Sequence, residues 1–200
     1  MKSKQLEVLL AQQLEIGGAE MLQRFQKLRD NGLLSKGRGR NAEFLSSIDI
    51  VDALLSIVAE KPGFAGQRII VLGRLMPVGG PEAGFAGAAT FRQAVAAALD
   101  DEKALESLRQ IRVSDHDFAT NAMGRAAISY SDGDQIKTAW YVPSTAVSHF
   151  QPGYEVTFDP LEGAPKVFRE VVYAPTLLKM IVRRKKEPER VEALHSEYET

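Results

Sequence analysis

Two amphipathic segments separated by a pair of glycines constrain the N-terminal part of the chain most strongly. Leucines recur at helical spacing over residues 4–15, which predicts a helix whose apolar face is Leu6, Leu9, Leu10 and Leu14. Gly17 and Gly18 then break the pattern, because glycine is unfavourable inside a helix. A second helix is expected over 19–31, with an apolar face of Met21, Leu22, Phe25 and Leu28. The chain is thus expected to begin with two short helices joined by a tight turn.

A third helix is expected after a polar, basic loop at residues 35–43. Ser46 or Ser47 can cap its start, and apolar residues recur at helical spacing from Ile48 to Glu60. Residues 63–88 are rich in Gly and Pro, so we interpret them as a linker. The apolar run 69–72 inside this linker is expected to form a strand.

The second half of the chain changes from helical to alternating periodicity. A helix is expected over 91–111, which Asp100 and Asp101 can interrupt. Alternating runs at 127–131 and 135–141 flank Asp132-Gly133-Asp134, and Asp-Gly in this position predicts a β-hairpin. The remaining expected elements are strands over 155–159 and 167–173, a helix over 176–182, and a charged helix or frayed tail over 183–200.

The segment from Leu10 to Leu34 contains one continuous motif. It places the small Ala11 where two helices must approach closely, and it ends on Gly32-Leu33-Leu34. This pattern resembles the helix-turn-helix of bacterial winged-helix transcriptional regulators, which implies that the second helix enters the major groove of DNA. Gly17-Gly18 stands where a polar cap is usual, and no wing-like hairpin follows Leu34. The same spacing also fits a plain helical hairpin in an α-helical core.

The resemblance makes the polar face of the second helix a candidate DNA-contacting surface. Gln and Arg side chains form bidentate hydrogen bonds with adenine and guanine edges, and Lys and Arg also hold phosphates. The loop that follows alternates Arg with Gly and resembles a minor-groove hook. The candidate DNA-binding residues are therefore Gln23, Arg24, Gln26 and Lys27 of the helix and Lys36, Arg38, Arg40 and Asn41 of the loop.

The charge distribution supports a DNA-docking head. The formal net charge is -1, yet residues 1–43 contain eight basic and five acidic residues, so the head is positive and the remainder negative. The chain has no cysteine, which excludes disulfides and thiol-ligated metals. The three histidines, His116, His149 and His195, lack metal-ligand spacing, and no catalytic cluster or cofactor motif is apparent.

These observations predict a non-enzymatic protein of the α+β class without metal or cofactor. We expect a helical helix-turn-helix domain over 1–62, the linker over 63–88, and a mixed α/β domain with a small antiparallel sheet over 89–200, which mediates oligomerisation or partner binding. No segment approaches about 18 uninterrupted apolar residues, so we expect no membrane helix and a cytoplasmic location. The expected function is sequence-specific binding of double-stranded DNA by a homodimeric bacterial or phage transcriptional regulator. The alternative is a phage DNA-packaging or assembly protein that grips DNA with a similar helix pair.

Overall fold

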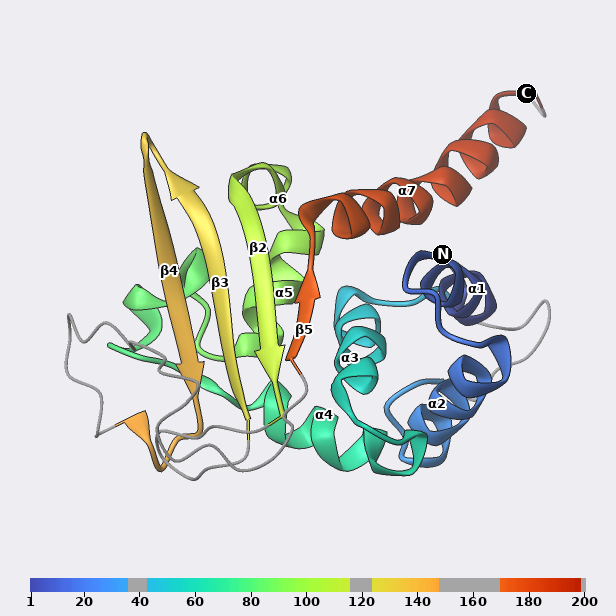
Figure 1. The fold of residues 1–200 in the computed structure, drawn as a ribbon. Coiled ribbons are helices and arrows are strands. Elements are labelled where there is room, and N and C mark those ends of the chain that lie inside the picture. The colour runs from blue at the N-terminus through green and yellow to red at the C-terminus, as the bar shows by residue number, and fades with distance from the viewer. Residues whose placement is uncertain (36–42, 116–123, 148–169, 199–200) are drawn as a thin grey trace.

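The fold belongs to the α+β class, as the sequence predicts. A computed structural model describes residues 1–35, 43–115, 124–147 and 170–198, with side chains up to residue 187. Within these ranges seven α-helices accompany one five-stranded antiparallel sheet (Figure 1). The helices are α1 (Ser3–Gln13), α2 (Gly18–Asp30), α3 (Ser47–Val58), α4 (Ala65–Gly73), α5 (Phe91–Asp100), α6 (Glu102–Ser107) and α7 (Pro175–Tyr198). The strands are β1 (Met76–Pro77), β2 (Leu108–Ser114), β3 (Arg125–Asp132), β4 (Gln135–Val142) and β5 (Glu170–Tyr173).

The first three helices lie where their apolar periodicity predicts them. α1 and α2 bury the residues at helical spacing on their facing sides, which are Leu6, Leu10, Met21, Phe25 and Leu28. Leu22 is an exception, because 49% of its surface is exposed. Ser46 caps α3, as expected, since its hydroxyl accepts from the Asp49 backbone N–H at 3.1 Å and its own N–H donates to the Asp49 carboxylate at 2.8 Å.

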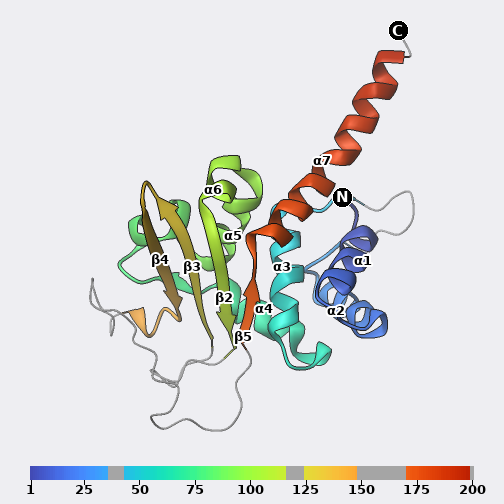
Figure 2. The ribbon, with the colours of Figure 1, turned by 45° about the horizontal axis from the view of Figure 1, so that its top comes forward.

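The sheet has the order β1-β4-β3-β2-β5 with every pair antiparallel. The predicted hairpin is confirmed: β3 ends at Asp132, β4 begins at Gln135, and Gly133 in the turn has a positive φ of 60°. α5 and α6 cover one face of this sheet (Figure 1). The N-terminal helices lie beyond β5, at the edge opposite β4, in both views (Figures 1 and 2).

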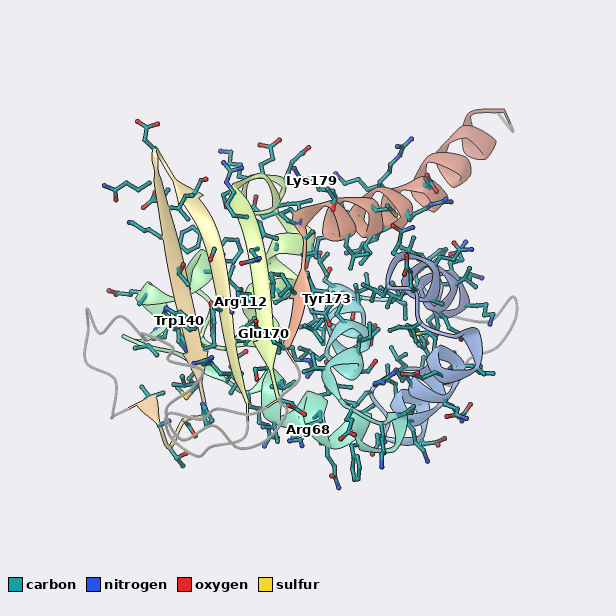
Figure 3. All side chains as sticks on the ribbon, in the orientation of Figure 1. Arg68, Arg112, Trp140, Glu170, Tyr173 and Lys179 are labelled. Atoms are coloured by element: carbon teal, nitrogen blue, oxygen red, sulfur yellow. The ribbon has the colours of Figure 1, made fainter. Side chains whose placement is uncertain are left out.

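The helical head and the sheet share one hydrophobic core. A single cluster of buried apolar side chains runs from Met1 in the head to Ile181 in α7. The Tyr173 hydroxyl on β5 donates a hydrogen bond of 2.6 Å to the Leu54 carbonyl on α3, and Figure 3 shows Tyr173 at this junction. The domain boundary expected at residue 62 therefore falls between helices that pack into the same core.

The segment expected to be a linker contains a helix, and the strand predicted over 69–72 is wrong. These residues belong to α4, in which Ala65, Ile69 and Leu72 are buried while Ile70 is 46% exposed. That burial follows helical spacing, so packing of one face overrides the β-propensity of the Ile-Ile-Val run. Leu75 and Phe85, further along the same segment, also lie in the core.

The helix expected over 91–111 ends early. The interruption at Asp100-Asp101 is confirmed, because the Asp101 carboxylate caps α6 by accepting from the Lys103 N–H at 2.8 Å. Residues from Leu108 onward form β2 instead of helix, with Ile111 and Val113 alternately buried. The predicted strand over 167–173 is found as β5 from residue 170, and the two C-terminal segments form the single helix α7. The strand expected over 155–159 lies outside the described residues.

Candidate nucleic-acid interface

A four-residue turn, 14–17, joins α1 to α2. Glu15 adopts a positive φ of 53°, and the Ile16 N–H donates to the Ala11 carbonyl at 3.0 Å, which reverses the chain after α1. Gly17 is the N-cap residue of α2 and provides no side-chain cap. At the other end of the pair, Arg29 in the last turn of α2 donates to the Ser3 hydroxyl at 2.9 Å. This bond joins the N-terminal end of α1 to the C-terminal end of α2. A plain antiparallel helical hairpin would allow the same contact.

The outer face of α2 is polar and exposed at three of the four positions predicted to contact DNA. Gln23, Gln26 and Lys27 all face solvent, while Met21, Phe25 and Leu28 anchor the opposite face. Asp30 engages two of the three: it accepts from the Gln26 amide at 2.8 Å, and its carboxylate lies 3.9 Å from the Lys27 ammonium. Base contacts by Gln26 therefore require its amide to leave Asp30.

The expectation that Arg24 also faces outward is wrong. Its side chain is fully buried, and its guanidinium donates to the carbonyls of Ser56 and Ala59 at the end of α3. It also bonds the Glu20 carboxylate at 2.6 Å and 3.0 Å. Arg24 thus holds α2 against α3, and its buried side chain is not available to contact DNA.

The basic loop, with Lys36, Arg38, Arg40 and Asn41, lies outside the described residues, but both of its flanks are anchored. On the first flank, Leu34 is buried and its N–H donates to the Leu28 carbonyl at 3.3 Å. On the second flank, the Leu45 N–H donates to the Met1 carbonyl at 3.0 Å, and the Lys2 ammonium lies 5.6 Å from the Phe44 ring centre. The loop therefore starts at the C-terminal end of α2 and returns to the N-terminus of α1.

A groove of about 490 Å³ lies between α1 and α2. Val8, Ala11, Ile16 and Leu22 supply its apolar walls, and Val8 and Leu22 are 43% and 49% exposed. Glu7 lies in this groove with only 4% of its surface exposed, paired with Lys4 through one carboxylate oxygen. Its other oxygen, Oε2, has no hydrogen-bond partner among the described residues.

A second basic surface lies on α7, within and just before the segment expected to be a charged helix or frayed tail. Lys179, Arg183 and Lys186 line a groove of about 380 Å³ against α6, together with Glu102 and Glu187. None of these three cations forms an ion pair within the described part of the chain. Figure 3 shows Lys179 on the side of α7 away from α2. Lys179 and Arg183 are four residues apart in the sequence, so helical spacing alone could have placed them on the same face of α7.

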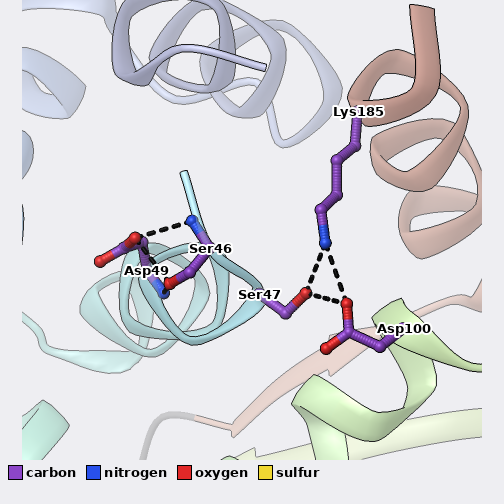
Figure 4. Close-up of polar contacts among 5 residues, drawn as sticks. All are labelled: Ser46, Ser47, Asp49, Asp100 and Lys185. Atoms are coloured by element: carbon purple, nitrogen blue, oxygen red, sulfur yellow. Dashed lines mark hydrogen bonds and ion pairs between the residues drawn. The ribbon is translucent and has the colours of Figure 1, made fainter. Parts of the chain in front are cut away.

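Lys185 fixes α7 to the rest of the molecule. Its ammonium donates to Asp100 at the end of α5 at 2.9 Å and to Ser47 at the start of α3 at 2.7 Å (Figure 4). Ser47 in turn donates to Asp100 at 2.5 Å. Burial by itself would raise the pKa of Asp100, but the hydrogen bonds from Ser47 and Lys185 and the Lys185 charge outweigh burial and lower the pKa. This cluster joins three helices that are distant in sequence.

Comparisons with known family models, with curated proteins and with solved structures found no match for this chain. Across the described ranges, no three acidic or histidine side chains are grouped so that they could hold a metal ion. No helix within the same ranges combines the length and apolar character needed to cross a bilayer.

Proposed function

We propose that this chain is a sequence-specific DNA-binding protein, a transcriptional regulator of a bacterium or phage that acts in the cytoplasm. The outer face of α2 enters the major groove, where Gln23 and Gln26 hydrogen-bond to base edges and Lys27 holds a phosphate. Lys36, Arg38, Arg40 and Asn41 of the following loop contact the phosphate backbone and the minor groove.

The observation that carries this proposal is the division of α2 into two faces. Met21, Phe25 and Leu28 are completely buried, so the helix is held rigidly and presents Gln23, Gln26 and Lys27 outward. Rigid presentation matters, because base recognition requires side chains held in register with the groove. Both flanks of the basic loop are anchored beside the same helix pair, Leu34 to α2 and Leu45 to the start of α1.

Selection of binding sites from a pool of random duplexes tests the proposal directly. We expect the full-length wild-type protein to enrich one short motif. Gln23→Ala and Gln26→Ala should each relax the preference at one position, at a cost of roughly 1–3 kcal/mol against the best site. Gln93→Ala is the matched control, because Gln93 is an exposed glutamine on α5.

Two results would contradict the proposal. Absence of any enriched motif with wild-type protein argues against sequence-specific recognition. An unchanged motif in both α2 variants shows that this helix does not contact bases. The stoichiometry on DNA separates the two DNA-binding alternatives, since regulators bind as dimers and packaging subunits as rings.

A further inference from the structure

The outer edge of β4 is open along the first half of the strand. β1 is the neighbour of β4 on that side, but its register covers only Tyr141 and Val142. The Val78 N–H also donates to the Trp140 carbonyl at 2.8 Å, and this is the last hydrogen bond along that side of β4 among the described residues. Within the described ranges, no backbone hydrogen bond joins residues 135–139 to a neighbour on that side. Both ribbon views show the corresponding part of β4 as the free border of the sheet (Figures 1 and 2).

The register identifies which backbone groups face the open side. In an antiparallel strand the N–H and C=O groups of alternate residues point to the same neighbour. The Trp140 carbonyl points away from β3, toward β1. Ile136 and Thr138 have the same parity as Trp140, so their N–H and C=O groups also point away from β3. The edge thus offers two donors and two acceptors in an unbroken, bulge-free strand.

The protection of this edge against pairing with another chain is limited to one lysine. Exposed edges are commonly blocked by proline, a bulge or charged side chains, lysine above all. Residues 135–139 contain no proline, and their register with β3 shows no shift. Lys137 is the one charged residue among them, and Asp132 pairs with it. Ile136, at 72%, is the most exposed large apolar side chain among the described residues.

We propose that two copies of this chain pair through their β4 edges, antiparallel about a two-fold axis at Ile136. The two sheets then form one continuous sheet across the dimer. A second copy fits because an antiparallel edge is complementary to itself: each Ile136 N–H faces the Ile136 carbonyl of the other copy. The contact also covers the apolar Ile136 side chain on both copies.

The open length of β4 selects this register. Pairing about Ile136 uses residues 134–138 and stops before Trp140, whose carbonyl is already bonded. A two-fold axis at Lys137 would place two ammonium groups directly opposite each other, which is unfavourable. An axis at Thr138 would require the outer groups of Trp140. Pairing about Ile136 instead places Gln135 opposite Lys137, a neutral side chain against a cation that Asp132 already compensates.

The pairing does not depend on DNA binding, so its test omits DNA. Because the chain has no cysteine, Ile136→Cys creates a single thiol. Residues paired by two hydrogen bonds have Cβ atoms about 5.5 Å apart, slightly too far for an unstrained disulfide but well within the reach of a short bifunctional maleimide. Such a reagent should therefore join two copies of the full-length variant into a covalent dimer. Ile70→Cys, at an exposed position on α4, is the matched control and should stay largely monomeric. Equal rates of cross-linking for the two variants would overturn the proposal.

Light scattering of the unmodified protein supplies the second measurement. Wild-type protein should dimerise, and Ile136→Lys should weaken the dimer by roughly tenfold or more in Kd, because it places two ammonium groups at the axis. Ile136 is exposed, so this change leaves the fold of each copy intact, which circular dichroism checks. Ile70→Lys should leave the dimer unchanged. Wild-type protein that stays monomeric at high micromolar concentration, or an Ile136→Lys variant that dimerises as wild type does, contradicts the proposal.

Discussion

Arg24 Nη1 on α2 lies 3.0 Å from the carbonyl oxygen of Ala59, so a buried guanidinium caps the C-terminal end of α3. The same nitrogen also donates to the Ser56 carbonyl. The last carbonyls of a helix lack intrahelical donors, and a cation at this end is favoured by the helix dipole. Arg24 is therefore a structural residue that sets the position of α2 on α3.

Replacing Arg24 with methionine should destabilise the fold. Methionine fills similar space but leaves the Ser56 and Ala59 carbonyls without their donor, which costs roughly 1.5–3 kcal/mol for charge-assisted hydrogen bonds. Urea unfolding followed by circular dichroism measures the change. Gln23→Met, one residue away on the exposed face, is the control and should shift stability by less than about 0.5 kcal/mol. Equal stability of the two variants would show that Arg24 is not a buried cap.

The two apolar residues Phe25 and Leu22 should respond very differently to truncation. Phe25 is completely buried, so Phe25→Ala should cost about 3–5 kcal/mol of unfolding free energy. Leu22 is 49% exposed, so Leu22→Ala should cost much less, because little area is lost from the core. Thermal melts of both variants give the comparison. A larger loss for Leu22→Ala than for Phe25→Ala would contradict the assignment of Phe25 to the core.

The sequence predicted the helices of the head but not the burial of Arg24. Apolar spacing located Met21, Phe25 and Leu28 correctly. Arg24 follows Met21 by three residues and precedes Leu28 by four, so helical spacing alone places it beside this buried stripe, and its assignment to the outer face was wrong. Helical spacing cannot identify its partner, the Ala59 carbonyl at the end of α3. Such a contact between residues separated by 35 positions has no local signal.

The difference between local signals and tertiary packing also explains which of the other elements the sequence predicted. The β3–β4 hairpin was predictable, because Asp-Gly fixes its turn locally. α4 was missed, because Ile69 is buried by tertiary packing that the Ile-Ile-Val run alone does not reveal. Three of the eight candidate interface residues, Gln23, Gln26 and Lys27, lie on the exposed face as expected for a contact surface. Its contact with DNA stays a prediction.

Asp52 should make stability depend on pH. Asp52 is fully buried and ion-paired with Arg92, and burial raises its pKa from 3.8 to about 6 despite the opposing effect of Arg92. Since the folded state holds the proton more tightly than the unfolded chain, this contribution is complete below about pH 4 and is lost as the pH rises through about 6. A shift of this size corresponds to about 3 kcal/mol at neutral pH.

Urea unfolding of wild type and Asp52→Asn from pH 4 to 8 checks this prediction. The two proteins should have similar stability near pH 4, and the variant should become relatively more stable as the pH rises, because asparagine cannot ionise. Glu106→Gln, which changes an exposed carboxylate on α6, should follow the wild-type curve. A constant difference between wild type and Asp52→Asn across this range would contradict the raised pKa.

Asp30 should limit the affinity of the α2 face for DNA. Its carboxylate holds the Gln26 amide at 2.8 Å and adds a negative charge beside the duplex. Asp30→Asn removes that charge, so we expect tighter binding, by several-fold at low salt, with the gain shrinking as salt is raised. Fluorescence anisotropy with a labelled duplex measures it. Glu82→Gln, an exposed carboxylate distant from α2 in sequence, is the control; equal gains would indicate a general charge effect.

The basic loop should provide affinity that depends on salt and tolerates sequence changes. Each phosphate neutralised by a protein cation releases counterions, so Arg38→Ala combined with Arg40→Ala should reduce the slope of log K against log salt by about 2. The control is Lys61→Ala combined with Lys103→Ala, which removes one exposed cation after α3 and one on α6 and changes the net charge by the same amount. It should keep the wild-type slope. Binding titrations at four or more salt concentrations give these slopes. If the loop variant keeps the wild-type slope while its overall affinity falls, Arg38 and Arg40 act on the fold of the head and do not contact phosphates.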